Sequence, residues 1–224
     1  MKTLNSIFAI FKREFQISYR NFSDILSILI FFILGVIIFV FAIGPSSEIF
    51  NKIGVGIIWT LILLSNTLSL RKFYQEDFDD NSIILFHMSG LSYETIVLIK
   101  IIVMWIFIQI PFLIIIPIGS ILLNIEFTNI KYIYLSFIIG SPIITCISSI
   151  SGSMNLLNKK NFALGSVIIM IFSIPVLIFA VSLVNVDKNN VDALLNILLG
   201  IMLFFFSITP WTCAISIKLG IQNK

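Results

Sequence analysis

Charged side chains are scarce in this chain. Of its 224 residues, 11% are Asp, Glu, Lys or Arg, whereas soluble domains carry about 25%. Hydrophobic residues make up 58%, above the ~45–50% that is usual in soluble proteins. This composition excludes a soluble globular protein and is typical of an integral membrane protein. Because the chain is too short to add a soluble nucleotide-binding domain, we expect residues 1–224 to form a single membrane domain.

Motifs for catalysis are also missing. The chain has no G-x-x-x-x-G-K-[ST] phosphate-binding loop, and no glycine cluster stands in its place. His87 is the only histidine, and the two cysteines, Cys146 and Cys213, lie in apolar runs where a thiol behaves as a small hydrophobe. We therefore predict no enzyme activity, no metal site and no disulfide framework. The net charge of +3 follows the membrane topology, so we expect no nucleic-acid partner.

Six apolar runs approach or exceed the roughly 20 residues that a helix needs to cross a hydrocarbon core. They predict an all-α membrane protein with spans at Ile25–Ile43, Ile53–Leu70, Ile96–Leu123, Tyr132–Ser153, Ala163–Val186 and Ala193–Ile217.

The distribution of Lys and Arg predicts the orientation, because cationic loops are retained in the cytoplasm. Eleven of the fourteen cations lie in the N-terminal segment, in the segment Arg71–Lys100, between the fourth and fifth spans, or in the tail. The alternate loops carry one each, Lys52, Lys131 and Lys188. We therefore expect both termini in the cytoplasm.

Ionisable groups are absent from the predicted spans except for Lys100. That residue lies near the cytoplasmic end of its span, where we expect its stem to snorkel toward the headgroups. Ion-coupled carriers and intramembrane hydrolases need charged or ligating groups at membrane depth, so these classes are disfavoured. A transporter with this sequence would take its energy from a cytoplasmic ATPase.

The spans are instead marked by residues that bend helices or let them approach. Proline removes a backbone donor, and a stripe of small residues at steps of three or four permits close packing. Ordinary bundle packing and a substrate path are both open interpretations. Besides Thr145 in the stripe and Pro210 in the last span, the candidate residues are Pro111, Pro117, Ser141, Pro142, Ser148, Gly152 and Pro175.

Residues 1–22 have an amphipathic pattern. Six apolar, mostly aromatic residues from Leu4 to Phe22 recur at steps of three or four, whereas Lys2, Arg13 and Arg20 fall on the opposite side. We expect a helix lying flat in the headgroup layer, its aromatic face toward the membrane and its cations toward anionic lipid. A poorly ordered tail is the alternative.

The segment between the second and third spans, residues 71–95, holds four of the eleven acidic residues within five positions. An apolar stretch that is too short to span follows them and ends at Gly90. This pattern predicts a short surface helix, capped at its start by carboxylates, that offers apolar side chains to a partner. A solvated connector whose acids balance Arg71 and Lys72 is the alternative. The candidate partner-binding residues are Glu76, Asp77, Asp79, Asp80, Leu85, Phe86, Met88 and Gly90.

Several stretches in order resemble the CcmB family, the haem exporter protein B permeases of cytochrome c maturation. They are "GVGIIWTLILLSNTLSLRKFYQEDFDDNSI", "GLS", "GSPIITCISSISGSM" and "FSIPVLIFAV". The most specific pieces are "EDFDD", the Gly140–Pro142 triplet and the "IPV" at Ile174–Val176. The "HMSGLS" after the acidic run departs from the proline-containing turn that is common in the family.

The resemblance implies a permease subunit of an ABC transporter in a bacterial or mitochondrial inner membrane. It implies that residues 1–22 are an elbow helix and that residues 76–90 form the coupling helix on an ATP-binding CcmA-like subunit. Further implied partners are CcmC-like and CcmD-like membrane proteins and, indirectly, a haem chaperone. Haem is then cargo of the complex and ATP is bound by the partner, with no cofactor on this chain.

The residues leave the role in haem transfer open. The subunit either carries haem through its spans or relays ATPase motion that releases a loaded chaperone. A non-transporting scaffold for assembly factors and a permease for lipid, polysaccharide or drug are the remaining alternatives.

Overall fold

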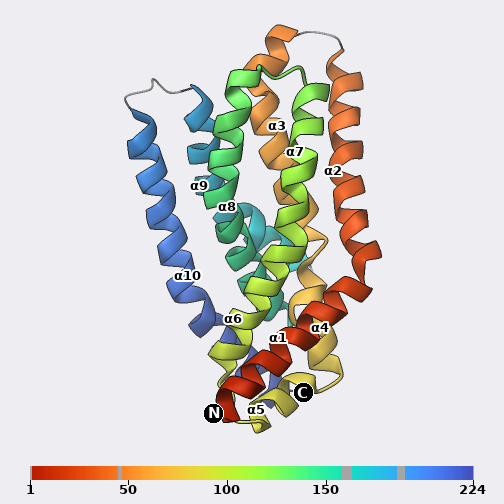
Figure 1. Cartoon of the computed structure of the whole chain (residues 1–224), viewed down its shortest axis with the longest axis vertical. Helices are drawn as coiled ribbons and strands as arrows, with labels where there is room; N and C mark the ends of the chain where they lie inside the picture. The colour runs from red at the N-terminus through yellow and green to blue at the C-terminus, as the bar shows by residue number, and fades with distance from the viewer. Residues whose placement is uncertain (1, 45–46, 158–162, 186–189, 224) are drawn as a thin grey trace.

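The computed structural model describes residues 2–44, 47–157, 163–185 and 190–223 (Figure 1). Within these ranges the chain is helical and contains no strand. The helices are α1 Lys2–Arg20, α2 Phe22–Ile43, α3 Ser47–Thr67, α4 Leu70–Asp79, α5 Ser82–Met88, α6 Tyr93–Met104, the π-helical η1 Trp105–Gln109, α7 Ile110–Leu122, α8 Phe127–Asn155, α9 Ala163–Asn185 and α10 Val191–Gln222.

Six helical stretches of the described residues are long and apolar enough to cross a membrane. Both ends of the chain lie at the same end of the bundle, together with α1, α4 and α5 (Figure 1). The predicted all-α integral membrane architecture is therefore confirmed. The stretches are Phe22–Ile43, Glu48–Thr67, Tyr93–Leu122, Asn129–Asn155, Gly165–Val184 and Val191–Gln222.

The second span ends earlier than the sequence predicts. The helix α3 stops at Thr67, and Leu70, the expected last residue of this span, instead begins α4. Polar side chains cause the break, because the Thr67 and Ser69 hydroxyls donate to the carbonyls of Leu64 and Asn66. The expected loop over residues 71–95 is thus mostly helical, as α4 and α5.

The third span contains a π-helical turn, η1, directly before Pro111. Proline has no N–H to bond the carbonyl four residues earlier, and a π turn absorbs that missing hydrogen bond. The Gln109 amide at the end of η1 donates to Asn66 Oδ1 of α3 at 2.7 Å. The Trp105 indole at its start donates to Ser141 Oγ of α8 at 3.1 Å. The irregular turn thus fixes polar contacts to two neighbouring spans.

The predicted small-residue stripe is buried along α8, which packs against α4, α9 and α10. Ser141, Thr145 and Ser148 each expose at most 1% of their surface. At Gly152 an added Cβ would lie 3.0 Å from the Leu70 carbonyl oxygen, so the α4 backbone would have to move slightly to admit a larger residue. The stripe therefore lies where α8 packs closely against its neighbours. Pro117, Pro142 and Pro175 lie inside α7, α8 and α9.

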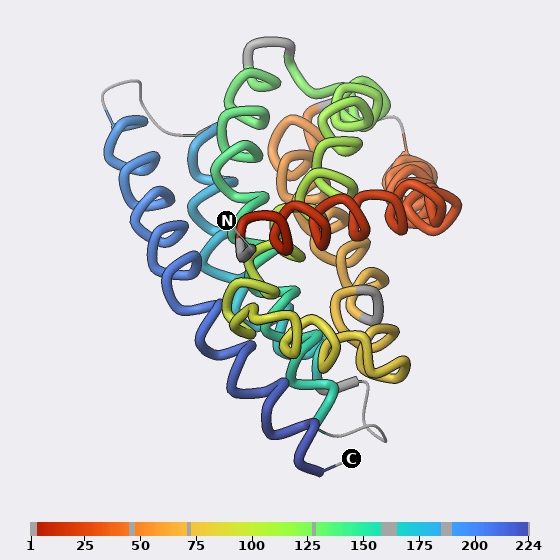
Figure 2. The backbone as a smooth tube through the Cα atoms, turned by 60° about the horizontal axis from the view of Figure 1, so that its bottom comes forward, coloured from red at the N-terminus to blue at the C-terminus, as the bar shows by residue number. Residues whose placement is uncertain are grey.

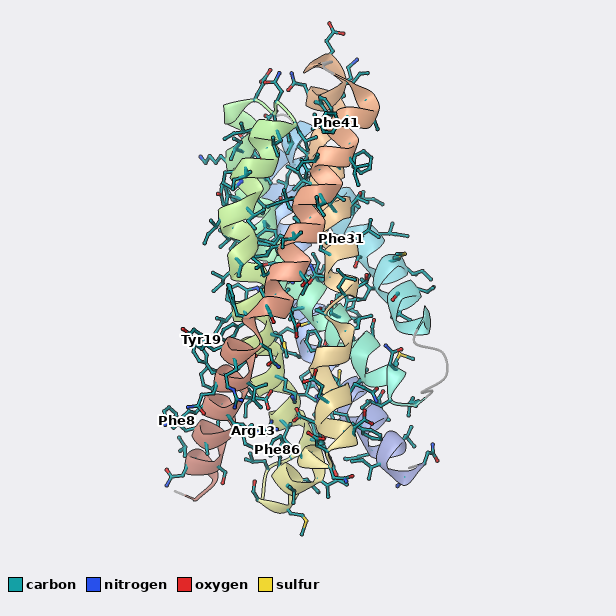
Figure 3. All side chains as sticks on the ribbon, turned by 90° about the vertical axis from the view of Figure 1, so that its right-hand side faces the viewer. Phe8, Arg13, Tyr19, Phe31, Phe41 and Phe86 are labelled. Atoms are coloured by element: carbon teal, nitrogen blue, oxygen red, sulfur yellow. The ribbon has the colours of Figure 1, made fainter. Side chains whose placement is uncertain are left out.

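The N-terminal helix α1 crosses the lower end of the bundle and packs on α6 (Figures 1 and 2). Ile10 packs with Ile96 and Ile99 of α6 in a small apolar core. Phe8 and Tyr19 point away from the bundle (Figure 3), with 69% and 71% of their surface exposed. The predicted aromatic face is thus exposed only in part, because Phe15 contacts Phe107 of the third span at 4.7 Å between ring centroids and Phe11 packs on the small apolar core.

Several cations that predict the orientation lie outside the described residues. They include Lys159, Lys160 and Lys188. For Lys2, Arg71 and Lys72 the structure describes the backbone but not the side chain. Whether Arg71 and Lys72 balance the acidic residues is therefore beyond the described part of the structure.

Candidate functional site: buried charges beneath the N-terminal helix

The acidic residues lie at the end of one helix and not at the start of another. Glu76, Asp77 and Asp79 belong to the last two turns of α4, and Asp80 follows as its C-cap. The prediction that these carboxylates cap a short helix at its start is therefore wrong. At a helix C-terminus the helix dipole disfavours negative charge, so these carboxylates need other partners. The next helix, α5, begins after Asn81, whose positive φ of 59° makes a tight left-handed turn.

The apolar side chains of α5 face two ways. Leu85 and Met88 are exposed, with 63% and 78% of their surface free. Phe86 instead packs toward α1, where the Arg13 guanidinium lies 4.9 Å from its ring centroid (Figure 3). The expectation that Phe86 is offered to a partner is thus not met in this structure. Gly90, with φ of 91°, follows the end of α5 as predicted.

His87 is held by its neighbours at the end of α5. Its Nδ1 is 2.9 Å from the Leu91 carbonyl oxygen, and its ring stacks on Tyr93 at 4.2 Å between centroids. Among the described residues no group of three His, Cys, Asp or Glu side chains could hold a metal ion.

A cluster of four charged residues joins α1, α4 and α6. Lys100 of α6 donates to Asp77 of α4, and it donates to Glu14 Oε2 of α1 at 2.9 Å. Arg13 donates to Asp77 Oδ1 at 2.8 Å, to Glu14 Oε1 at 2.6 Å and to Ser82 Oγ at 3.5 Å. We call Arg13, Glu14, Asp77 and Lys100 the charge cluster. It ties three segments together that are far apart in the sequence.

Burial makes these contacts strong. The side chains of Lys100, Glu14 and Asp77 expose only 1%, 4% and 10% of their surface, and that of Arg13 exposes 33%. The prediction that Lys100 snorkels to the headgroups is wrong, because two carboxylates neutralise it inside the protein. The prediction that Arg13 faces anionic lipid is wrong for the same reason. Removing one partner from a buried ion pair costs about 3–5 kcal/mol, because the other charge is left uncompensated.

The cluster also sets the charge state of Asp77. Burial by itself would raise the pKa of Asp77, but the Lys100 and Arg13 cations outweigh burial and lower it below its ordinary value. Burial would lower the pKa of Arg13, and the Asp77 and Glu14 carboxylates raise it instead. Asp77 is therefore ionised and Arg13 is protonated at neutral pH.

Sequence reasoning missed Glu14 as a site residue. One signal was available, since Glu14 is the only acidic residue in an otherwise cationic N-terminal helix. Around the helix, Glu14 falls between the aromatic and cationic faces. It lies four residues after the buried Ile10 and four residues before the buried Ser18, so the three residues share one face. What the sequence could not show is that Glu14 and Lys100 meet.

A second polar group lies deeper, between α4, α8 and α10. The Tyr74 hydroxyl is 2.6 Å from Ser149 Oγ, which is 3.4 Å from Cys213 Sγ. Cys146 and Cys213 are buried free thiols. These contacts give buried polar atoms hydrogen-bond partners, and the contact between Tyr74 and Ser149 holds α4 against α8.

These features define a class of protein. The chain is an all-α integral membrane protein with six membrane-length helices in its described part. Its N-terminal helix is tied by buried charges to the helical segment that joins the second and third spans.

Comparison with known proteins gives the family. The model of the CcmB protein matches residues 5–220, and the chain belongs to the CcmB family. "Heme exporter protein B" of Haemophilus influenzae is 30% identical over 216 residues, which cover 96% of this chain and 98% of that protein. The proteins of the same name from Bradyrhizobium diazoefficiens and Escherichia coli K12 are 27% and 26% identical over 222 and 215 residues. They cover 98% and 95% of this chain and 100% and 98% of their own length. The resemblance stated from the sequence is thereby confirmed.

Proposed function

We propose that this chain is the membrane permease subunit of an ATP-driven transporter that delivers haem for c-type cytochromes. The observation that carries the haem role is the CcmB match over residues 5–220, together with relatives named "Heme exporter protein B" over nearly their whole length. In this proposal the chain performs no chemistry itself and ATP hydrolysis belongs to a partner subunit.

The orientation in the proposal follows from charge. The end of the bundle with α1, α4 and α5 faces the cytoplasm, and the membrane is the bacterial inner membrane. Arg13, Arg20 and Lys218 lie at this end, whereas Lys52 and Lys131 belong to the other end.

The α5 helix is the proposed docking element for the ATPase. It is the outermost part of the chain at this end (Figures 1 and 3), and Leu85 and Met88 are its exposed apolar side chains. A short helix with two apolar anchors fits a groove on a partner surface. Phe86 serves instead to hold α5 against Arg13 of α1.

The charge cluster is the proposed route for movement. A push on α5 passes through the short turn at Asn81 to Asp77 at the end of α4. Asp77 is held by Lys100 of the third span and by Arg13 of α1, so α4 cannot move without them. The cluster thereby connects an outer docking helix to a membrane span. CcmA-like, CcmC-like and CcmD-like subunits are the partners that this assignment expects.

A deletion strain tests the assignment. Loss of the chain should abolish covalently bound haem in c-type cytochromes, and the wild-type chain should restore it. The double substitution Leu85→Asp and Met88→Asp should fail to restore it, and the ATPase subunit should no longer co-purify although the chain remains in the membrane.

The matched control is Asn223→Asp, which adds negative charge at another exposed position of the same end. It should restore both haem attachment and co-purification. Normal c-type cytochromes in the deletion strain would refute the haem role, and undiminished co-purification of the double variant would refute docking by α5.

A further inference from the structure

The third span is a single membrane-length stretch, Tyr93–Leu122, but its two halves pack on different helices (Figure 1). The lower half, α6, packs mainly on α1 and α10, whereas the upper half, α7, packs mainly on α2 and α3. Lys100 of the charge cluster belongs to α6. The half of the span that is tied to α1 and α4 is therefore not the half that is fixed to the first two spans.

The two halves meet at η1, where the regular hydrogen bonds of an α-helix are interrupted. A π turn contains one residue more than an α-helical turn. Pro111, the second residue of α7, has no N–H for the Phe107 carbonyl four residues earlier. Helices kink at both kinds of interruption. Fewer backbone hydrogen bonds therefore oppose bending at η1 than in the regular turns of α6.

A second interruption lies beside the first, in α8. The Trp105 indole at the start of η1 donates to Ser141 Oγ at 3.1 Å, and Ser141 directly precedes Pro142 inside α8. Pro142 has no N–H for the carbonyl of Ile138. The third span and α8 thus have their interruptions side by side, joined by a hydrogen bond, and the two helices can bend together at this point.

An apolar groove of about 470 Å³ lies next to both interruptions. Trp105 and Pro142 line it, together with Cys146 of α8 and Met202 and Phe206 of α10. Protein interiors are close-packed, so a helix that moves elsewhere has to displace tightly packed side chains. At this groove the third span and α8 can change their angle to α10 without that cost, and no polar contact is broken because the lining is apolar.

Gln109, at the end of η1, leaves a polar atom unsatisfied in the present arrangement. Its side chain is buried, and its amide nitrogen donates to Asn66 Oδ1 of α3 at 2.7 Å. Its Oε1 accepts no hydrogen bond from the described residues. A buried acceptor without a partner costs about 1–3 kcal/mol. This cost narrows the free-energy gap between the present arrangement and a tilted one in which Oε1 gains a donor.

We propose that η1 is the hinge of the third span, about which α6 tilts against α7 while the lower half of α8 bends at Pro142. The hydrogen bond from Gln109 to Asn66 fixes the pivot to α3, and the charge cluster moves α1 and α4 with α6. The hinge rests on the proposed function for its driving force, which the ATPase supplies. With 12 residues at about 1.5 Å each, α6 is about 18 Å long. A change of about 20° in its angle therefore moves its lower end by about 6 Å.

The test is the distance between spin labels at Thr95 of α6 and Leu26 of α2, in a full-length chain with Cys146 and Cys213 replaced by alanine. Leu26 is exposed and Thr95 is partly exposed. A second pair, Leu26 and the exposed Ile118 of α7, reports the upper half of the span. In the isolated chain the Thr95–Leu26 distances should be spread more widely than the Ile118–Leu26 distances, by about 6 Å. In the assembled complex, trapped nucleotide should shift the first distance and leave the second constant.

Pro111→Ala and Pro117→Ala are the matched variants, because both prolines lie in α7 and are partly exposed, but Pro117 lies farther from η1. Pro111→Ala gives the Phe107 carbonyl a donor and should narrow the Thr95–Leu26 distribution, whereas Pro117→Ala should leave it unchanged. Deletion of Ile106 shortens the π turn to the length of an α-helical turn and should narrow the distribution as well. The deletion tests the hinge if Pro111→Ala fails to fold.

Three results overturn the hinge. They are a wild-type Thr95–Leu26 distribution as narrow as that of Ile118–Leu26, a distribution that neither Pro111→Ala nor the Ile106 deletion narrows, and equal narrowing by Pro117→Ala. A distribution that narrows in the hinge variants but does not shift with nucleotide in the complex supports the hinge and refutes its drive by the ATPase. Failure of the hinge and failure of the proposed function are therefore distinguishable.

Discussion

Glu14 and Lys100 are 86 positions apart in the sequence, yet their side chains form a 2.9 Å ion pair inside the protein. The pair joins the N-terminal helix to the third span, and Asp77 on α4 shares the same ammonium group. A lysine within an apolar span is costly unless it is paired. We therefore expect the cluster to matter for folding and for movement.

Lys100→Met should destabilise the folded protein by about 3–5 kcal/mol, because Glu14 and Asp77 are left buried with Arg13 as their one cation among the described side chains. The measurement is thermal unfolding of the purified chain in detergent. Lys218→Met is the matched control, since Lys218 is 54% exposed and lies 4.0 Å from Glu94. An exposed pair of this kind contributes about 0–1 kcal/mol, so similar losses in both variants would contradict a stabilising cluster.

The cluster should also make stability depend on pH. The pKa of Asp77 is lower in the folded chain than its ordinary value of 3.8, so the folded state binds this proton less readily than the unfolded state. The stabilisation is therefore complete above that ordinary value and declines as pH falls toward and through the folded pKa. Melting temperatures measured from about pH 6 down to about pH 3 should fall more steeply for wild type than for Asp77→Asn. Parallel curves would show that Asp77 is not the responsible group.

Gly152→Val should weaken the contact between α8 and α4. The added carbon would meet the Leu70 carbonyl oxygen at 3.0 Å, and overpacking of this kind costs about 1–3 kcal/mol. The control is Gly56→Ala in α3, where nothing lies within 4 Å of the added carbon. Unfolding in detergent should show a loss for the first and little change for the second. If Gly152→Val were as stable as wild type, the close approach of α4 would be refuted.

The hydrogen bond between Gln109 and Asn66 should couple the second and third spans. In a double-mutant cycle with Gln109→Leu and Asn66→Leu, the interaction free energy should be about 0.6 kcal/mol, as for hydrogen bonds between membrane helices. Additive single losses would show that the 2.7 Å contact adds no stability.

The sequence predicted the spans well because hydrophobic length is a local property. All six predicted runs overlap the membrane-length helices of the described residues, and the predicted stripe from Ser141 to Gly152 is buried in α8. The prediction placed the end of the second span at Leu70, which is too late. Thr67 and Ser69, whose hydroxyls help to end α3, barely lower the average hydrophobicity of this segment. Periodicity thus predicts which segments are helical better than where each helix stops.

The charge cluster was beyond sequence reasoning for a different reason. A lysine near the end of a span has two physical outcomes, snorkelling to the headgroups or pairing inside the protein. The choice depends on whether a carboxylate from a distant segment is placed beside it. In this chain Glu14 and Asp77 come from two other helices, and only the packing of α1 on α6 brings them to Lys100.

The central claim is that the charge cluster makes α1, α4 and α5 move as one body when the ATPase acts. The direct measurement is the distance between spin labels at Phe8 of α1 and Ser89 after α5, both exposed, in a chain with Cys146 and Cys213 replaced by alanine. The distance is measured in the assembled complex with and without trapped nucleotide. A second pair, Phe8 and the exposed Ile178 of α9, reports movement relative to a span that the charge cluster does not hold.

We predict that nucleotide changes the Phe8–Ile178 distance and leaves the Phe8–Ser89 distance constant. In an Arg13→Met chain the Phe8–Ser89 distance should change as well, because Arg13 is the residue of α1 that bonds Asp77 of α4 and contacts α5. A wild-type Phe8–Ser89 distance that changes as much as the Phe8–Ile178 distance would contradict the claim.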